Sequence, residues 1–440
     1  MKQELANGLI LRTLSEGHGS DRARLPDFYA EINGEDDPPH IREGLRIWTR
    51  DLMEGHPTVT PEDIFVVVDP AHDDLIVSAT LLIPQMWRYE DIALPAGRPE
   101  LVGTHPDYRA RGLVRALFAA VHERSAALGH LVQGITGIPH FYRQFGYTMA
   151  VELDTHANFS LAMLSDAPDG AQPNFTLRPA TPADAPAILG WLDDAARGRL
   201  LSDQFSLETL RHEMAGHAAG HVIHTVSLVI VNAQGQDVGV VVLVDVLHNP
   251  HELRCAVYAV GRESSYLATF PDVVRAIKAW ASRRFAQCPE ILSFMPGIHE
   301  TLDTLIDRSP AGLIRRREYA WYLRVPDAVA FLTQIAPILE RRLEGSGANR
   351  YTGALRVGFH ALSGISLQFD EGRVHAIEAV TGKDGYDAEF PWHLFWNVVF
   401  GYRTVAEMSA VLPDVWANQK GAALLEILFP RKKSHLIGLV

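Results

Sequence analysis

The stretch "GTHPDYRARGLVRALFAAVHERSAALGH", from Gly103 to His130, passes from a turn-rich basic loop directly into a helical pattern. Arg109, Arg111 and Arg115 surround Gly112 where the loop meets the helix. The first turn of a helix has free N–H groups and a partial positive charge, so it attracts anions. A glycine has no Cβ and lets a ligand approach the backbone. The sequence thus predicts an anion-binding site at this helix start, with ordinary solvated turn residues as the alternative.

The helix after this loop is expected to lie on a sheet. Its apolar residues repeat at helical spacing in two adjoining rows, Leu113, Leu117 and Val121 beside Val114 and Phe118. Gly129 is a typical end for such a helix. The loop is neither a Walker loop, which needs Gly-Lys-Ser/Thr, nor a dinucleotide fingerprint with three glycines.

Length and composition limit the function classes. A chain of 440 residues is too long for one hydrophobic core, which favours two to four domains. A net charge of −13 argues against nucleic-acid binding and suits a cationic substrate. The sequence has no apolar run that could span a bilayer, no signal-peptide pattern, and only two cysteines, Cys255 and Cys288. We therefore expect a soluble cytoplasmic protein with no membrane or nucleic-acid partner.

The pattern of strands and helices along the chain predicts three units. The first alternates strands with helices up to a Pro/Gly/Asp-rich linker at 165–174, and the second starts again with strand, turn and helix. In the second unit, a β-meander over 226–260 precedes a helix expected to start at Pro271. The third unit begins near Pro326 with one helix over 327–343, followed by a hairpin over 364–380, two helical segments and a tail without helix signal.

The expected fold is therefore α/β in the first two units, each a mixed central sheet flanked by helices, and α+β in the third. The expected boundaries are 1–165, 172–325 and 326–440.

Two motifs in the first unit resemble those of the GNAT superfamily, the GCN5-related N-acetyltransferases. Arg109-Ala110-Arg111-Gly112-Leu113-Val114 resembles the acyl-CoA signature Arg/Gln-x-x-Gly-x-Gly/Ala, although Val114 replaces the small residue. Downstream, "FYRQFGY" over 141–147 resembles the family's Phe-Tyr-x-x-x-Gly-Phe/Tyr segment at the family's spacing.

The resemblance implies acetyl-CoA as cosubstrate. The backbone amides of 110–115 would hold its pyrophosphate, the preceding strand end would pair with its pantetheine arm, and the turn after the next strand would lie beside it. The cofactor-binding residues implied in this way are Val102, Gly103, Thr104, Ala110, Arg111, Gly112, Leu113, Val114, Arg115, Gly137 and Ile138.

Acetyl transfer from a thioester to an amine requires a proton for the leaving thiolate and stabilisation of an oxyanion. A thiol has an ordinary pKa of about 8.5 and a tyrosine one of about 10, so a tyrosine O–H can share its proton with the departing sulfur. Tyr142 is the candidate for this role. Tyr147 is expected to be an aromatic plug beneath the sheet instead.

The order of units resembles the enhanced intracellular survival acetyltransferases. That family joins an active acetyltransferase domain, a degenerate one and a sterol-carrier-like C-terminal domain. "LRPATPADAPAIL" at 177–189 resembles the start of a second acetyltransferase-like domain, yet 261–277 has no acyl-CoA signature, so this domain is expected to bind no cofactor. The segments 390–408 and 428–435 are similar to the sterol-carrier-like domain. The resemblance also implies a homo-oligomer, often a hexamer.

The general base is expected at the end of the chain. The resemblance implies that the C-terminal carboxylate, here on Val440, reaches the active site and accepts the amine proton. An apolar tail has reason to enter the protein, and its buried carboxylate then needs a cationic partner such as an amine. The alternative is a loose terminus.

Two other patterns are discounted. "RHEMAGHAAGHVIH" at 211–224 suggests zinc, but His212 and His217 are five residues apart, whereas the metalloprotease motif needs four; no metal is expected. The aromatic cluster from Trp392 to Tyr402 could line an apolar ligand pocket and is more simply explained as core.

The sequence therefore predicts an acetyl-CoA-dependent N-acetyltransferase. By resemblance, its acceptor is an amine: an aminoglycoside, another polycationic amine or a lysine side chain of a peptide. The alternative is a protein that binds acyl-CoA or an apolar ligand with little turnover.

Overall fold

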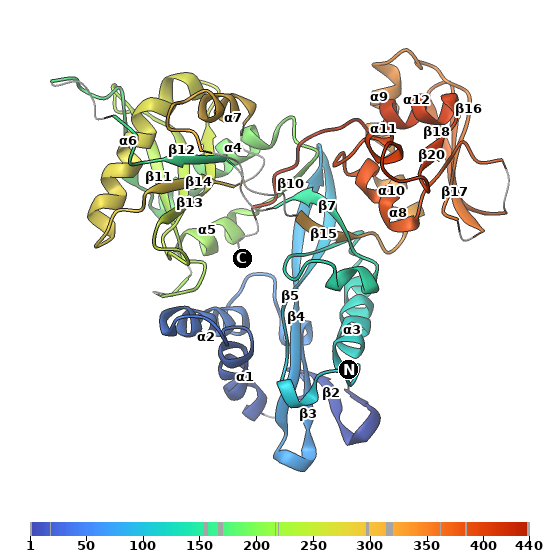
Figure 1. The fold of residues 1–440 in the computed structure, drawn as a ribbon, viewed down its shortest axis with the longest axis horizontal. Helices are drawn as coiled ribbons and strands as arrows, with labels where there is room; N and C mark the ends of the chain where they lie inside the picture. Colours follow the sequence, from blue (N-terminus) through green and yellow to red (C-terminus); the bar gives the residue numbers. More distant parts are fainter. Residues whose placement is uncertain are drawn as a thin grey trace.

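The computed structural model of the chain describes residues 2–17, 19–153, 157–165, 170–215, 217–218, 220–295, 299–313, 320–360, 362–382 and 385–437. Three separate sheets with their helices form the body of the molecule (Figure 1). Together they give the mixed α/β fold with several helix-flanked sheets that the sequence predicts.

The first sheet has nine strands in the order β1-β2-β3-β4-β5-β6-β15-β7, with β10 paired to β4. Their bounds are β1 Lys2–Glu4, β2 Ile10–Thr13, β3 Ile64–Asp69, β4 Leu75–Tyr89, β5 Ile92–Thr104, β6 Val132–Ile135, β7 Thr148–Glu152, β10 Leu201–Asp203 and β15 Ala320–Arg324. The hairpin of β4 and β5 is its longest pair, and β5 and β6 run parallel.

Helices cover both faces of this sheet: α1 (Gly19–Ile32) and α2 (Pro39–Met53) on one, α3 (Leu113–Ala127) on the other (Figure 1). Strand β3 shows why, since all six of its residues are buried. Ile64, Val66 and Val68 pack in the core of α1 and α2, whereas Phe65 and Val67 pack in the core of α3. Successive strand residues point to opposite faces, so a continuous apolar run indicates a sheet covered on both sides.

A buried ion pair fixes α1 to the sheet. Arg12 of β2 donates two hydrogen bonds of 2.8 Å to the carboxylate of Asp21 in α1, and these side chains are 3% and 0% exposed. Such a two-point contact sets the position of the helix as well as its distance from the sheet.

The second sheet has six strands in the order β8-β14-β13-β12-β11-β9. Their bounds are β8 Ala157–Ser160, β9 Phe175–Pro179, β11 Thr225–Asn232, β12 Asp237–Val244, β13 Glu252–Val260 and β14 Ile291–Phe294. Strands β11, β12 and β13 pair antiparallel, which confirms the predicted meander. The helices of this unit are α4 Ala185–Ala196, α5 Leu207–Ala215, α6 Tyr266–Arg284 and α7 Glu300–Asp307.

The predicted helix start at Pro271 is wrong. The helix α6 begins at Tyr266, because the side chain of Ser265 caps it by accepting a hydrogen bond from the Ala268 amide (3.2 Å), and Pro271 lies inside. A proline at that position cannot bond the carbonyl of Leu267, but the 64% exposure of Leu267 gives water access to this turn.

Strands near the unit ends are exchanged between sheets. Although β8 precedes the linker, it joins the second sheet, and β15, at the end of the range predicted for the second unit, inserts between β6 and β7 of the first. The sheets therefore do not coincide with continuous sequence ranges, and the boundaries 1–165, 172–325 and 326–440 stay a prediction.

The third sheet has five strands in the order β18-β17-β16-β19-β20. Its elements are β16 Gly353–Gly358, β17 Ser363–Asp370, β18 Arg373–Thr381, β19 Ala388–Glu389 and β20 Trp416–Ala417, with α8 Ala328–Gln334, α9 Ala336–Glu344, α10 Trp392–Val399, α11 Val405–Ser409 and α12 Gln419–Leu428. The predicted hairpin is confirmed, and its two turn residues, Glu371 and Gly372, have φ of 50° and 80° as a tight hairpin requires.

Two helix predictions in the third unit need correction. The single helix expected over 327–343 is broken at Ile335 into α8 and α9, because Pro337 has no N–H for the Thr333 carbonyl and is tolerated only in the first turn of α9. Three helices, not two, follow the hairpin. Of the aromatic cluster, Phe395, Trp396 and Phe400 are buried in the core, as predicted.

Short 3-10 helices connect several of these elements: η1 Ala6–Gly8, η2 Pro61–Asp63, η3 Pro70–His72, η4 Pro106–Tyr108, η5 Phe141–Phe145 and η6 Pro182–Asp184. Among the described residues, no helix combines the length and the apolar character needed to cross a membrane.

We predict that Asp21→Ala destabilises the chain far more than Asp27→Ala. The first change leaves the Arg12 guanidinium buried without its partner, which costs about 3–5 kcal/mol. Asp27, on the same helix, pairs with Arg46 and its side chain is 63% exposed, so its loss should cost less than about 1 kcal/mol. Urea denaturation of both variants measures the two free energies of unfolding, and equal losses would contradict the proposed role of the buried pair.

Candidate functional site

A cleft opens where two parallel strands of the first sheet diverge. Strands β5 and β6 pair at only two positions, Ala96 with Val132 and Gly97 with Gln133. Beyond them the strand ends separate and border a cleft of about 820 Å³. The segment 101–104 lines one side, 135–138 the other, and the loop 108–115 closes one end.

A β-bulge redirects β5 at the cleft. Gly103 pairs with Ala79 and Glu100 with Leu81, so two residues of β5 face Thr80 alone, and Leu101 has a φ of 51°. The Thr80 hydroxyl donates a 3.0 Å hydrogen bond to the Glu100 carbonyl and holds the bulge in place. A bulge re-aims the backbone that follows it, here the segment that lines the cleft.

The N-terminus of α3 faces the same cleft with unpaired amides. Gly112 is its N-cap residue, with a φ of 77° and no side-chain cap. The first helical hydrogen bond runs from the Ala116 amide to the Gly112 carbonyl (3.1 Å), so the amides of 113–115 have no acceptor within the helix. A Cβ built on Gly112 would meet nothing within 4 Å, which leaves open space in front of these donors.

Two exposed arginines flank this helix start and add positive charge. The Arg111 guanidinium lies 4.5 Å over the Tyr108 ring and donates to the Asp107 carbonyl (2.8 Å). The Arg115 guanidinium lies 5.8 Å over the Phe145 ring on the other side. Free amides, a helix dipole and two cations together form a site for a polyanion such as a pyrophosphate.

The loop before α3 is anchored to the sheet by a buried tyrosine. Tyr108 donates a 2.6 Å hydrogen bond to the carboxylate of Asp69 at the end of β3. This bond and the neighbouring His72 hold the pKa of Asp69 below its usual value. The charged carboxylate therefore keeps the loop in one position relative to β5.

Tyr142 lies against the opposite strand end. It belongs to η5, is 5% exposed, and its hydroxyl lies 3.5 Å from the position that a Cβ on Gly137 would take. Its ring contacts those of Phe118 and Tyr322, which fix its orientation at the cleft wall. A phenol held in this way can donate a proton into the cleft.

Tyr147 is buried beneath the sheet instead. It is fully buried and does not line the cleft. Its hydroxyl oxygen lies 3.0 Å from His122 Nε2. Burial raises the pKa of Tyr147 above its usual value and lowers that of His122 to about 3, so both side chains are neutral. This placement agrees with its predicted role as a plug.

The structure brings the predicted site residues into this one cleft. All eleven cofactor-binding candidates and Tyr142 line it, namely Val102, Gly103, Thr104, Ala110, Arg111, Gly112, Leu113, Val114, Arg115, Gly137, Ile138 and Tyr142. Their roles stay predictions. Val440 lies outside the described residues, which end at Ile437, whose amide donates to Asp203 of β10 (2.7 Å).

Glu100 is a site residue that the sequence analysis missed. Its side chain is 15% exposed, it lines the cleft just before the bulge, and it accepts a 2.8 Å hydrogen bond from Arg98. The burial of the nearby Tyr29, and then the charge of Glu100, raise the pKa of Tyr29. In the sequence, Glu100 could have been noticed because Arg98 and Glu100 are charged residues at alternate positions of an otherwise apolar strand.

The described part of the second unit differs from the first at the start of its long helix. Strand β14 pairs with the first four residues of β13, from Glu252–Ile291 to Cys255–Phe294. The N-terminus of α6 is capped by Ser265, and a Cβ on Gly261 would lie 2.9 Å from the Trp191 ring. This helix start has neither free space nor a full set of free amides.

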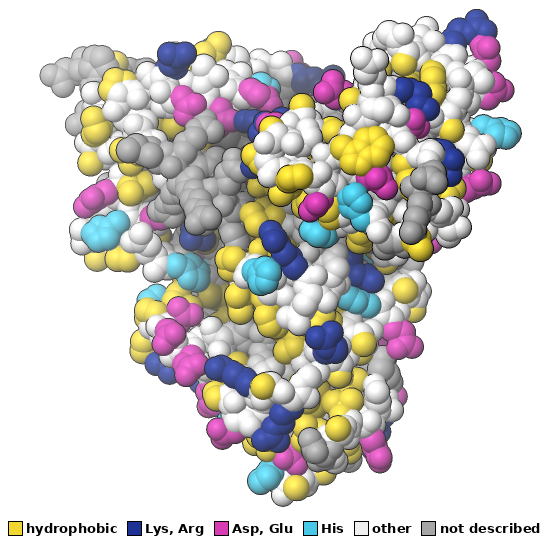
Figure 2. Space-filling model, turned by 45° about the vertical axis from the view of Figure 1, so that its right-hand side comes forward, with side chains coloured by type: hydrophobic (Ala, Val, Ile, Leu, Met, Phe, Trp, Pro, Cys, Tyr) yellow, Lys and Arg dark blue, Asp and Glu magenta, His cyan; other side chains and the backbone are white. Residues whose placement is uncertain are grey.

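On the face shown in Figure 2, basic, acidic and apolar side chains of the described residues are interspersed, without the continuous basic surface typical of nucleic-acid-binding proteins.

Residues 36–150, which contain the bulge, the loop, α3 and Tyr142, match the family model of the acetyltransferase (GNAT) domain. Solved structures extend the similarity of fold to nearly the whole chain. A conserved protein of unknown function from Enterococcus faecalis V583, described as a probable N-acyltransferase, has a TM-score of 0.66 and 11% identity, with 97% of this chain and 98% of that one covered.

Two further structures have the same overall fold. A GCN5-related N-acetyltransferase from Anabaena variabilis ATCC 29413 has a TM-score of 0.65 and 12% identity, covering 98% of this chain and 100% of its own. Eis1 from Mycobacterium abscessus has a TM-score of 0.61 and 13% identity, with the same coverages of 98% and 100%. A comparison with curated protein sequences finds no match.

We predict that Gly112→Asp weakens acetyl-CoA binding at least tenfold, or about 1.4 kcal/mol, because it places a carboxylate where the pyrophosphate should lie. Gly129→Asp is the matched control, since Gly129 also has a positive φ, 72°, and open space around it, but lies at the other end of α3. Calorimetry on both folded variants measures the affinities. Similar affinities for the two variants would contradict an anion site at Gly112.

Proposed function

We propose that the chain is an acetyl-CoA-dependent N-acetyltransferase. The observation that carries the proposal is the cleft between the diverging strands β5 and β6, with the free amides of α3 at one end and Tyr142 at its wall. In this assignment the pyrophosphate lies on the amides of 113–115 between Arg111 and Arg115. The pantetheine arm follows the backbone of 102–104, and the thioester lies near the bulge at Leu101.

The proposed reaction is a direct transfer. A neutral amine attacks the thioester carbonyl carbon, the C–N bond forms, and the tetrahedral intermediate collapses with loss of the C–S bond. Tyr142 gives its hydroxyl proton to the departing sulfur, so that coenzyme A leaves as a thiol. The proton lost by the amine goes to a carboxylate: the C-terminal carboxylate of Val440 remains our candidate, and Glu100 is the alternative among the described residues.

The acceptor is proposed to be a cationic amine: an aminoglycoside, another polycationic amine or a lysine side chain. The net charge of −13 favours such substrates over acidic ones. The second unit is proposed to bind no cofactor, and the third to be sterol-carrier-like. We also propose that the chain forms a homo-oligomer and acts in the cytoplasm.

The release of free thiol from acetyl-CoA, measured with a panel of amines, tests the proposal. An amine-dependent rate supports the transferase. Tight acetyl-CoA binding without thiol release for any class of amine would favour a protein that binds acyl-CoA or an apolar ligand.

We predict that Tyr142→Phe lowers kcat by about 10²–10⁴-fold and leaves acetyl-CoA affinity unchanged, because the ring remains and only the proton is lost. Tyr147→Phe is the control: it removes a hydroxyl of the same kind from the same aromatic cluster, outside the cleft. Its kcat should stay within a few-fold of the original. Single-turnover kinetics measure the chemical step directly, and a loss of less than threefold in Tyr142→Phe would make Tyr142 a packing residue.

We also predict one acetyl-CoA per chain, since the segment 261–277 has no acyl-CoA signature and the side chain of Ser265 caps the N-terminus of α6. Calorimetric titration gives the stoichiometry. Two tight sites per chain would show that the segment 261–277 binds a cofactor after all.

A further inference from the structure

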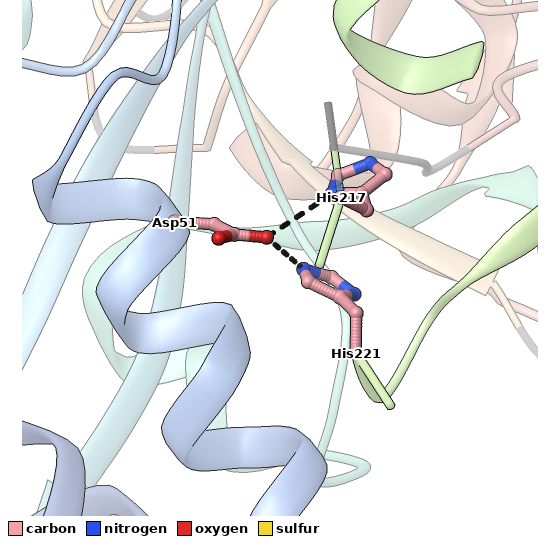
Figure 3. Close-up of side chains that lie close together, drawn as sticks. All are labelled: Asp51, His217 and His221. Carbon is pink, nitrogen blue, oxygen red and sulfur yellow. Dashed lines mark ion pairs between the residues drawn. The ribbon is translucent and has the colours of Figure 1, made fainter. Parts of the chain in front are cut away.

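A second cluster of titratable side chains lies where the first unit meets the second. Asp51 comes from α2, and His217 and His221 come from the loop between α5 and β11 (Figure 3). Asp51 Oδ2 lies 3.6 Å from His217 Nδ1 and 3.7 Å from His221 Nε2. The sequence analysis weighed only the histidines within one segment and did not include the distant Asp51.

The separations fit a metal ion better than direct hydrogen bonds. Both exceed the usual hydrogen-bond distance. Nitrogen and oxygen ligands about 2.0–2.1 Å from a tetrahedral ion lie about 3.3–3.4 Å apart, so the two distances from Asp51 to the histidines are within a few tenths of an ångström of this spacing. All three ligand atoms lie within 4.8 Å of one another.

The two ligand nitrogens are buried without a partner, whereas Asp51 Oδ2 accepts the Ala218 amide at 3.4 Å. The side chains of His217 and His221 are 4% and 0% exposed, and that of Asp51 is 18% exposed. Within the part of the chain that the structure describes, His217 Nδ1 and His221 Nε2 have no hydrogen-bond partner. Buried polar atoms are normally paired, so two such nitrogens that face one carboxylate oxygen indicate a missing ligand.

The second ring nitrogen of His217, which would not bind the ion, already faces a carboxylate. Its Nε2 lies 3.4 Å from the carboxylate of Glu213 in α5. A carboxylate on the far nitrogen keeps the proton there, which leaves the Nδ1 lone pair free for an ion. His212 adds a further buried Nε2 without a partner, and its ring lies 5.1 Å from that of His217.

His221 must change its tautomer to bind an ion. Its Nδ1 accepts the Ile223 amide at 3.2 Å, so in the ion-free chain the proton is on Nε2. Metal binding through Nε2 moves that proton to Nδ1 and exchanges this one hydrogen bond for a metal bond.

The two elements are already in close contact beside the cluster. The Val222 amide donates to the Gly44 carbonyl of α2 (3.3 Å), and a Cβ on Gly44 would lie 2.9 Å from the Val222 backbone. The two backbones that carry the ligands are therefore in contact before the ion binds. This limits the conformational entropy that the chain loses when it binds the ion.

We propose that Asp51, His217 and His221 bind one divalent transition-metal ion that clamps α2 to the loop between α5 and β11. Two imidazoles and one carboxylate suit Zn²⁺ and its neighbours rather than Mg²⁺ or Ca²⁺, which prefer oxygen ligands. Three protein ligands leave the fourth position of a tetrahedral ion open. The proposal does not depend on the acetyltransferase assignment.

The test uses the full chain, stripped with a chelator and titrated with Zn²⁺ by calorimetry. The expected result is one Zn²⁺ per chain and a rise in Tm on binding. Asp51→Ala and His221→Gln should each weaken binding by about a hundredfold or more, since loss of an outer-shell contact alone costs about 10–100-fold. His251→Gln, which removes a histidine with a 56% exposed side chain from the same unit, should bind as the original chain does.

Co²⁺ provides a readout that does not need the variants. Its visible absorption should show a low-symmetry site with nitrogen ligands in the original chain. The proposal is overturned if the stripped original chain takes up neither ion, or if the folded variants bind Zn²⁺ as tightly as the His251→Gln control.

Discussion

The divergence of two parallel strands is the feature on which the functional site depends. Strands β5 and β6 share two register positions and then separate, and the bulge at Leu101 turns the β5 backbone beside the gap. Neighbouring parallel strands normally bond to one another through evenly spaced hydrogen bonds. An unpaired strand edge inside a sheet has free backbone donors and acceptors, and an extended ligand arm can pair with them.

The helix α3 adds charge recognition to this opening. It starts directly beside the end of β5, so its free amides and the two flanking arginines lie at the mouth of the cleft. The free amides and the two arginines therefore place positive charge at the mouth of the cleft, where we propose that a nucleotide pyrophosphate binds. The anchor from Tyr108 to Asp69 ties this helix start to the same sheet.

The sequence predicts a set of residues that line one cleft, because they lie in short, continuous motifs. Gly112 and Tyr142 are close in sequence to the strand ends that they serve. Glu100 and Asp51 could not be identified in the same way, since their significance comes from partners in other elements. The exchange of β8 and β15 between sheets is equally invisible to local patterns. Pro271 misled the prediction because the Ser265 cap, and not the proline, determines where α6 begins.

Hydrogen–deuterium exchange of the full chain with and without acetyl-CoA tests the central claim most directly, because it reports which backbone amides the ligand covers. The account predicts slower exchange in peptides that cover 101–115 and 135–142, and little change across 261–277 in the second unit. Unchanged exchange at 110–115 in a chain saturated with acetyl-CoA, or protection at 261–277 instead, would contradict it.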